Sequence, residues 1–203
     1  MDKSFTPSGF GSTAIHGGHD QDPRYAHQVP IYASSTYVYD TAEQGMKRFS
    51  GKEPGYIYSR WGNPTITEAE QKIAALESFG GLPEVKGILH GSGMAAITTL
   101  FLSTLKSGDK VLTHFSLYGG TEELLQNILP GLGIEAIVVD LRQLDKVEDI
   151  IKKDKNIRML YLETPANPTI QCVDLIELSR IGKAHQLMVA CDNTFATPYL
   201  QHP

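Results

Sequence analysis

The sequence predicts an α/β fold in which a mostly parallel sheet is flanked by helices. From residue 65 onward, short apolar segments alternate with segments of helical periodicity. Residues 159–162 (MLYL) and 187–191 (LMVAC) are apolar at consecutive positions, which is typical of parallel strands covered on both faces. The chain has 203 residues, 41% hydrophobic and 20% charged, and is therefore long enough for one substantial core.

The expected elements follow one another with a turn signal at most boundaries. Ser107-Gly108 and Pro130-Gly131 are expected to end two of the helices. The expected strands are 85–89, 110–115, 136–139, 158–163 and 187–192. The expected helices are 41–49, 66–76, 94–105, 120–129, 144–152 and 175–185. Because no helix follows the last strand before Pro203, we expect a longer polypeptide in which this sheet is completed.

Residues 1–55 are expected to form an N-terminal arm. They are rich in Gly, Pro, Ser, Tyr and His, and only residues 41–49 show helical spacing. A segment of this kind cannot bury a core of its own, so it needs another surface to lie against. The predicted organisation is therefore an arm at 1–55 and an α/β domain at 56–203 that is incomplete at its C-terminal end.

Composition excludes several classes of protein. A formal net charge of −5 with interspersed signs argues against a nucleic-acid-binding protein. No apolar run approaches the roughly 20 residues of a membrane-spanning helix, and the N-terminus lacks the apolar core of a signal peptide. Cys172 and Cys191 are the only cysteines, a number typical of reduced cytoplasmic enzymes. We therefore expect no nucleic-acid or membrane partner and a cytoplasmic location.

A glycine-rich turn precedes the helix expected at 94–105. Gly91–Ala96 fits the G-x-G-x-x-G/A pattern, in which backbone N–H groups at a helix start bind phosphate. A dinucleotide site also needs an acidic residue at the end of the next strand, but that strand leads into Ser116 and Tyr118. The pattern therefore favours a single phosphate over a dinucleotide. A glycine-rich turn without a ligand is the alternative.

Other polar and aromatic residues follow the expected strands. Tyr118, Asn167 and Asp192 come after three different strands, and ligands of parallel sheets bind at the carboxyl ends of the strands. Taken singly, each has a structural explanation: a core ring, a turn before proline and a cap. Together with the phosphate turn, they match a phosphorylated pyridine, which needs a stacked ring, a donor to its phenolic oxygen and a carboxylate near its nitrogen.

Five segments resemble the trans-sulfuration, or Cys/Met-metabolism, family of enzymes that depend on pyridoxal 5'-phosphate (PLP). They are YIYSRWGNPT at 56–65, GSGMAAI at 91–97, SLYGGT at 116–121, LETPANPT at 162–169 and DNTFATPYLQHP at 192–203. The resemblance implies the type I fold of PLP enzymes, which is similar to that of aspartate aminotransferase. It also implies PLP as the cofactor.

The resemblance assigns a role to each of the matching residues. Tyr118 stacks on the pyridine ring and also serves the leaving group as an acid. Asp192 pairs with the ring nitrogen, and Asn167 faces the phenolic oxygen. Glu163 lies near the site and supports the residues that contact the cofactor. The residues implied at the phosphate are Ser92, Gly93 and Met94.

Tyr58 and Arg60 are implied to reach the cofactor phosphate of a neighbouring subunit. The resemblance therefore implies a homo-oligomer, a dimer of dimers, in which the arm lies between subunits. The family's cofactor-binding lysine follows the aspartate strand, and this chain ends before it. Lys106 lies in a similar sequence, Ser-Thr-Leu-Lys, but it closes a helix, where a cation complements the dipole, so we expect it to have no such role.

The activity implied by the resemblance is cleavage of a C–S bond in a sulfur amino acid by elimination, as in methionine γ-lyases and cystathionine lyases. Replacement at the γ-carbon of an activated homoserine uses the same residues and is the first alternative. A non-catalytic module that keeps the fold is the second, and a Rossmann oxidoreductase is the most distant. Methionine γ-lyases typically carry a cysteine where this chain has Gly120, as the cystathionine-processing members do, and this argues against methionine as the substrate.

Overall fold

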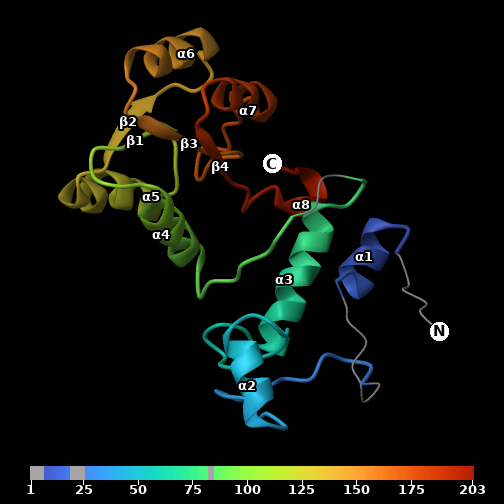
Figure 1. Ribbon diagram of the computed structural model, residues 1–203. Coiled ribbons are helices and arrows are strands. Elements are labelled where there is room, and N and C mark those ends of the chain that lie inside the picture. Colours follow the sequence, from blue (N-terminus) through green and yellow to red (C-terminus); the bar gives the residue numbers. More distant parts are fainter. Residues whose placement is uncertain (1–6, 19–25, 82–84) are drawn as a thin grey trace. The chain divides into compact units, whose positions relative to one another are not determined.

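The computed structural model describes residues 7–18, 26–81 and 85–203 (Figure 1). The chain forms two compact units, residues 1–89 and residues 90–203. Of the arm expected at 1–55, residues 1–6 and 19–25 lie outside the described residues. The division into an intersubunit arm and a PLP-binding domain concerns an assembly, and it stays a prediction.

Among its described residues, the first unit contains three helices. Asn63 caps α3 because its side chain accepts a hydrogen bond from the N–H of Thr65 at 2.9 Å, and Pro64 is the first helical residue, where proline is tolerated. Thr41 caps α2 in the same way, accepting from the N–H of Gln44 at 3.1 Å. The helices are α1 (Phe10–His16), α2 (Ala42–Phe49) and α3 (Pro64–Glu77).

Helix α1 is not among the elements expected from the sequence. Glycines 9 and 11 lower the helical propensity of this segment, and the helix is stabilised by packing against α3. The rings of Phe10 and Phe79 meet edge to face at 5.5 Å between centroids. The ammonium group of Lys72 donates a hydrogen bond to the carbonyl oxygen of Ile15 at 2.5 Å.

The second unit is built on a parallel four-stranded sheet with the strand order β2-β1-β3-β4. This confirms the parallel α/β fold predicted from the alternating pattern. Its strands are β1 (Lys110–His114), β2 (Glu135–Val139), β3 (Ile157–Glu163) and β4 (Met188–Asp192). Its helices are α4 (Gly93–Thr104), α5 (Gly119–Glu123), α6 (Leu144–Lys153), α7 (Leu175–Ala184) and α8 (Thr197–Leu200).

Helices lie on both faces of the sheet (Figure 1), and each face carries a separate hydrophobic core. Side chains alternate along a strand, so Met159 and Tyr161 face one side while Leu160 and Leu162 face the other. The first core packs against α4 and the helical segment after β1, with Phe101 fully buried. The second packs against α6 and α7. Both faces of β3 are therefore covered by helices.

Residues 85–89 do not form the expected strand. None of the four strands pairs with them, and a strand needs a neighbour for its backbone groups. The N–H of Leu89 instead donates to a carboxylate oxygen of Glu70 at 2.9 Å, and Ile88 is 76% exposed. The apolar run alone therefore does not specify a strand.

Two further elements differ from expectation. β4 is only half-buried because it lies at an edge of the sheet, and its first residue, Met188, is exposed. The helical segment after β1 continues beyond the stop expected at Pro130, through a π turn at Leu124–Ile128 and a 3₁₀ turn at Leu129–Leu132. Pro130 lies at the start of the 3₁₀ turn, where its missing N–H costs little, and Gly133 ends the segment in a left-handed conformation (φ 77°).

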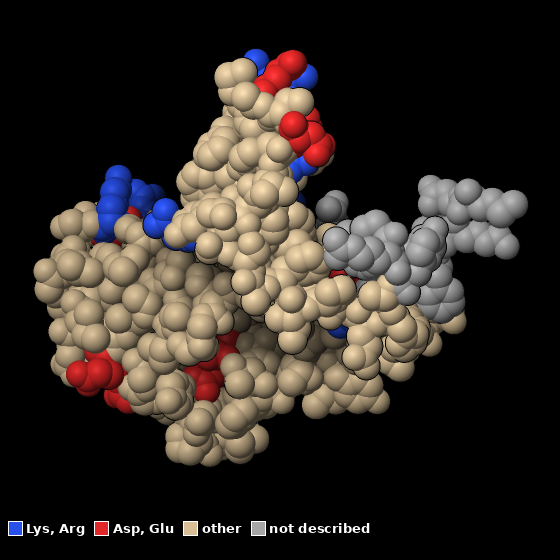
Figure 2. Space-filling model, turned by 90° about the horizontal axis from the view of Figure 1, so that it is seen from below, with Lys and Arg blue, Asp and Glu red and all other residues tan. Residues whose placement is uncertain are grey.

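Charged side chains lie in small, separate groups on the face shown in Figure 2. No continuous basic surface occurs there among the residues drawn in colour. None of the described helices is both long enough and apolar enough to span a bilayer.

Candidate functional site

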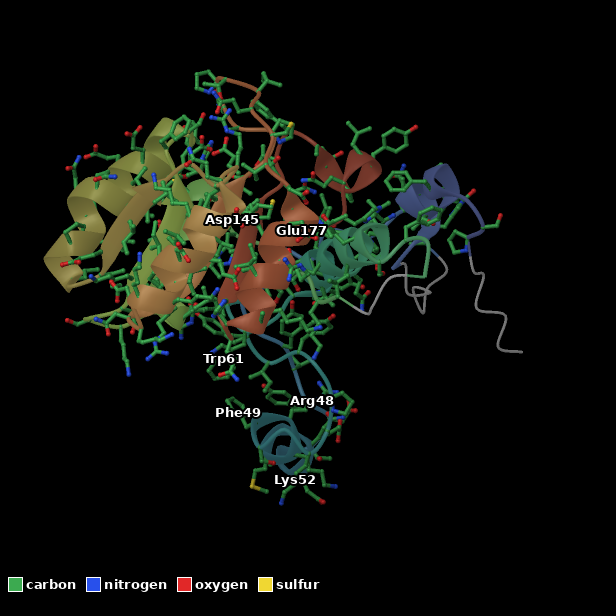
Figure 3. All side chains as sticks on the ribbon, turned by 90° about the horizontal axis from the view of Figure 1, so that it is seen from above. Arg48, Phe49, Lys52, Trp61, Asp145 and Glu177 are labelled. Atoms are coloured by element: carbon green, nitrogen blue, oxygen red, sulfur yellow. The ribbon has the colours of Figure 1, made fainter. Side chains whose placement is uncertain are left out.

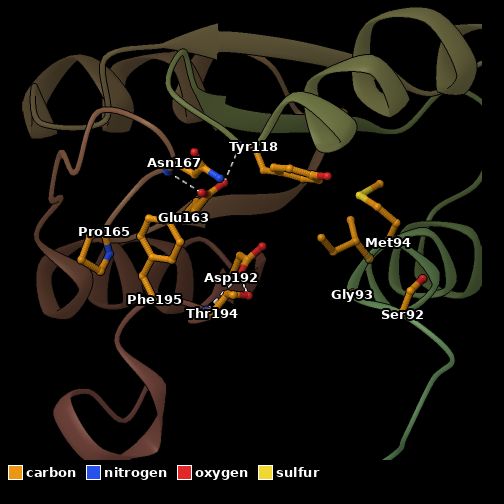
Figure 4. Close-up of a pocket in the computed structure, with 11 residues that line it drawn as sticks. Ser92, Gly93, Met94, Tyr118, Glu163, Pro165, Asn167, Asp192, Thr194 and Phe195 are labelled. Carbon is orange, nitrogen blue, oxygen red and sulfur yellow. Dashed lines mark hydrogen bonds between the residues drawn. The ribbon is translucent and has the colours of Figure 1, made fainter.

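A pocket of about 310 Å³ lies where strands β1, β3 and β4 end (Figure 4). The connection after β1 leads to β2 on one side of the sheet, and the connection after β3 leads to β4 on the other side. The two connections therefore leave the sheet in opposite directions between β1 and β3. Such a switch point is where parallel sheets bind ligands. The pocket is large enough for a small cofactor, since ligand sites are roughly 300–1,000 Å³. It is lined by Ser92, Gly93, Met94, Ile97, Tyr118, Glu163, Pro165, Asn167, Asp192, Thr194 and Phe195.

The N-terminus of α4 opens into this pocket. The side chain of Ser92 caps the helix by accepting a hydrogen bond from the N–H of Ala95 at 3.1 Å, and its carbonyl accepts from Ala96 at 3.1 Å. Among the described residues, no hydrogen bond occupies the N–H groups of Gly93 and Met94. A Cβ atom added at Gly93 would meet no atom within 4 Å, so the backbone borders open space. Two free N–H groups at a helix start are suited to an anion.

Tyr118 is the residue before α5, and its ring is half-exposed in the pocket. Gly120 lies close to this ring. A Cβ atom at residue 120 would lie 2.8 Å from Cε1 of Tyr118 and 3.0 Å from Sδ of Met94, both closer than van der Waals contact. The Tyr118 ring and the Met94 thioether therefore both rest against the bare backbone of Gly120.

Glu163 ends β3 and is 5% exposed. One of its carboxylate oxygens accepts a hydrogen bond from the N–H of Tyr118 and the other from the N–H of Asn167, both at 2.6 Å. Burial raises the pKa of the Glu163 carboxyl above its usual value although the two N–H donors lower it, and the charge of Asp192 raises it slightly further. The carboxylate thus joins the loops after β1 and β3 through their backbones.

Asp192 ends β4 and pairs in register with Glu163 on the neighbouring strand. Its Oδ1 atom accepts hydrogen bonds from the N–H of Thr194 at 3.0 Å and from the hydroxyl of Thr194 at 2.6 Å. Figure 4 shows Tyr118, Asp192 and the start of α4 around a common space. Polar groups from four different elements therefore converge on one pocket.

The structure brings together most, but not all, of the residues singled out from the sequence. Tyr58 and Arg60 lie in the first unit, where the Arg60 guanidinium lies 5.1 Å from the centroid of the Tyr58 ring, and neither lines this pocket. Their contact with a neighbouring subunit's phosphate stays a prediction. Sequence reasoning missed four lining residues, although all four lie in the segments that carry the resemblance: one in GSGMAAI, one in LETPANPT and two in DNTF. The missed residues are Ile97, Pro165, Thr194 and Phe195.

No group of three or more potential metal ligands occurs among the described residues. The pocket instead offers backbone N–H donors at one helix start, an aromatic ring, amide and hydroxyl groups, and a carboxylate. This set suits an organic anion with a flat ring.

Comparison with known proteins identifies the family. The sequence profile described as Cys/Met metabolism PLP-dependent enzyme matches residues 11–203. The chain belongs to this family. Among curated members, an L-methionine gamma-lyase from Fusobacterium nucleatum subsp. nucleatum is 47% identical over 197 residues, which is 97% of this chain and 48% of the relative. A cystathionine beta-lyase from Lactococcus lactis subsp. cremoris is 41% identical over 190 residues, 93% of this chain and 46% of the relative.

Solved structures of the family share the fold. The cystathionine gamma-lyase from Lactobacillus plantarum, complexed with L-serine, has a TM-score of 0.84 and 37% identity over 96% of this chain and 47% of that one. A family structure from Campylobacter jejuni, with a TM-score of 0.84 and 36% identity over 94% of this chain and 45% of that one, contains N'-pyridoxyl-lysine-5'-monophosphate. The type I PLP fold predicted from the sequence is confirmed. The chain spans about half the length of the curated relatives it matches.

PLP is the cofactor of this family, and the pocket fits it. The open N-terminus of α4 suits the phosphate, and no atom of the described residues fills the space beside Gly93. Asp192 supplies the negative charge that a protonated pyridine nitrogen needs, and Tyr118 supplies a ring that can stack.

Proposed function

We propose that the complete protein is a PLP-dependent lyase that cleaves the C–S bond of a sulfur amino acid, of the methionine or cystathionine type, by elimination. The L-methionine gamma-lyase and cystathionine beta-lyase relatives support this activity. A cytoplasmic location is part of the proposal, supported by a cysteine content typical of reduced enzymes.

Bound PLP supplies an electron sink for bonds at the substrate's α-carbon. The N–H groups of Gly93 and Met94, with Ser92, would hold its phosphate, since these two N–H groups lie at the start of α4 and have no partner among the described residues. Tyr118 would lie against the ring and deliver a proton from its hydroxyl to the departing sulfur. Asn167 would face the phenolic oxygen.

Asp192 would keep a proton on the ring nitrogen, which makes the ring an effective electron sink. The single observation that carries the proposal is that this carboxylate shares one pocket with the open helix N-terminus. An anion site with an acidic residue beside it suits a ligand that is negative at one end and positive at the other.

The substitution Asp192→Asn in the complete protein tests this assignment. We expect the rate of keto-acid release from methionine or cystathionine to fall by about 100-fold or more, because the amide cannot hold the proton at the ring nitrogen. Asp140→Asn is the matched control, because Asp140 also follows a parallel strand but pairs with Arg142 away from the pocket. Near-native turnover by Asp192→Asn would remove Asp192 from the mechanism.

Replacement at the γ-carbon is the second candidate function. An O-succinylhomoserine sulfhydrylase from Pseudomonas aeruginosa is 34% identical over 203 residues, 100% of this chain and 49% of the relative, which favours this alternative directly. Assays of the complete protein with methionine, with cystathionine, and with an activated homoserine plus a thiol distinguish the reactions. Elimination releases a keto acid and ammonia, whereas replacement forms a new thioether without either product.

A homo-oligomer, a dimer of dimers with shared sites, is part of the same proposal. The first unit exposes an aromatic surface in which the Trp61 ring meets Phe49 and Tyr58 at centroid distances of 6.1 and 6.2 Å (Figure 3). Phe49 and Trp61 are 61% and 65% exposed, and a second subunit would cover them. Arg60 lies beside Tyr58 at the edge of this surface, and these two residues would complete the phosphate site of the neighbouring subunit.

Mixed oligomers test the shared site. An Arg60→Ala chain combined with an Asp192→Asn chain should recover part of the activity, because one site in each mixed dimer receives both native residues. If Arg60 and Asp192 of the same subunit served one site, each site of a mixed dimer would lack one of the two residues and no activity would return. The two chains carry different tags, so that mixed dimers can be verified. If verified mixed dimers recovered no activity, this result would contradict the shared-site proposal.

A further inference from the structure

The two oxygens of the Asp192 carboxylate have different surroundings. Oδ1 accepts two hydrogen bonds, both from Thr194, through its N–H at 3.0 Å and its hydroxyl at 2.6 Å (Figure 4). Among the described residues, no hydrogen bond reaches Oδ2. The terminal torsion of an aspartate side chain is broad, so a carboxylate keeps one orientation only where donors hold it. The two donors of Thr194 fix the plane of this carboxylate.

Thr194 is itself held by the turn that follows β4. The side chains of Asn193 and Gln201 are joined, because Gln201 Nε2 donates to Asn193 Oδ1 at 2.8 Å and Asn193 Nδ2 donates to the Gln201 carbonyl at 2.9 Å. Gln201 Nε2 also donates to the carbonyl of Thr164, directly after β3, at 3.0 Å. The turn is thereby anchored to the neighbouring strand, and Thr194 occupies a defined position beside Asp192.

We propose that Thr194 is a positioning residue that orients the Asp192 carboxylate so that Oδ2 faces the cofactor's ring nitrogen. The proposal rests on the role of Asp192 in the proposed function. Thr194 needs no contact with the cofactor for this purpose. Its hydroxyl donates a hydrogen bond to a charged acceptor, the stronger class of hydrogen bond, and that bond ties the carboxylate to the anchored turn.

The complete protein loaded with ¹⁵N-labelled PLP provides a test independent of turnover. The ¹⁵N chemical shift reports whether the pyridine nitrogen is protonated, and titration gives the dissociation constant of PLP. We expect Thr194→Val, which keeps the shape but removes the hydroxyl, to move the signal toward the unprotonated position and weaken PLP binding about 3- to 10-fold. Thr194→Ser should retain the native signal, because its hydroxyl can make the same bond.

Two further variants make the outcome decisive. Thr113→Val removes a hydroxyl that donates to the Tyr161 carbonyl at 2.9 Å inside the sheet, so it should leave the ring nitrogen signal unchanged. Asp192→Asn provides the signal for complete loss of the carboxylate. Native values in Thr194→Val, with a displaced signal in Asp192→Asn, would overturn the role of Thr194 and leave that of Asp192 intact. An undisplaced signal in Asp192→Asn would overturn both.

Discussion

Replacing Glu163 with glutamine tests whether one buried carboxylate joins the two loops that border the pocket. Its two oxygens accept the N–H groups of Tyr118 and Asn167, both at 2.6 Å. A glutamine side chain has one acceptor oxygen and one NH₂ group at these positions. Glu163→Gln therefore keeps one hydrogen bond and turns a donor toward the remaining N–H, with little change in volume.

The expected cost follows from that count. A donor left without its partner in a mostly buried position costs about 1–3 kcal/mol. We expect the free energy of unfolding of the cofactor-free complete protein to fall by about 2 kcal/mol in Glu163→Gln, measured by urea unfolding. PLP binding should weaken as well, because Tyr118 and Asn167 both line the pocket and one of the two loses the hydrogen bond that anchors its backbone.

Glu177→Gln is the matched control. The Glu177 carboxylate pairs with Arg180 at 2.8 Å on the surface, and such pairs contribute about 0–1 kcal/mol. Equal, small losses in the two variants would refute the inference that Glu163 holds the loops. A normal free energy of unfolding in Glu163→Gln with defective PLP binding would place Glu163 in contact with the ligand instead.

Two other predictions concern the same pocket. Burial raises the pKa of the Glu163 carboxyl above its ordinary value of 4.5, so the folded protein binds the carboxyl proton of Glu163 more tightly than the unfolded chain does. The stability that this tighter proton binding contributes is present below pH 4.5 and is lost as the pH rises through the folded-state pKa. In urea unfolding, the difference in free energy of unfolding between the native protein and Glu163→Gln should therefore be larger at pH 5 than at pH 8. A larger difference at pH 8 would contradict this prediction. Gly120→Ala places a methyl group 2.8 Å from Cε1 of Tyr118, so the ring must shift and PLP binding should weaken about fivefold. The methyl group of Gly119→Ala meets no atom within 4 Å, so this control variant should bind PLP normally. Equal weakening in both variants, measured by PLP titration, would rule out this steric explanation.

The fold was predictable where local pattern and tertiary packing agree. The strands of the sheet begin and end within one or two residues of the expected positions, because apolar runs such as 159–162 are bounded by polar residues and turn signals. α1 and residues 85–89 were not predicted correctly, because packing decides both. α1 is stabilised by α3, and the apolar run 85–89 has no partner strand.

The candidate site was predictable at the level of strand ends. Chain order alone places Tyr118, Asn167 and Asp192 at the carboxyl edge of a parallel sheet, and all three line one pocket. The hydrogen bonds of Glu163 and Thr194 depend on loop conformations that no periodic pattern encodes. The functions of Tyr58 and Arg60 depend on a second subunit, so they stay predictions.

The pairing of Glu163 with Asp192 across β3 and β4 also limits how the gene can vary. Successive side chains of a strand point to opposite faces, so inserting or deleting one residue within β4 would turn the final carboxylate toward the other face of the sheet. The turn between α7 and β4 is free of that restriction, because length changes there leave the register intact. Natural relatives should therefore differ in length around residues 185–187 and keep a constant spacing across the five residues of the strand.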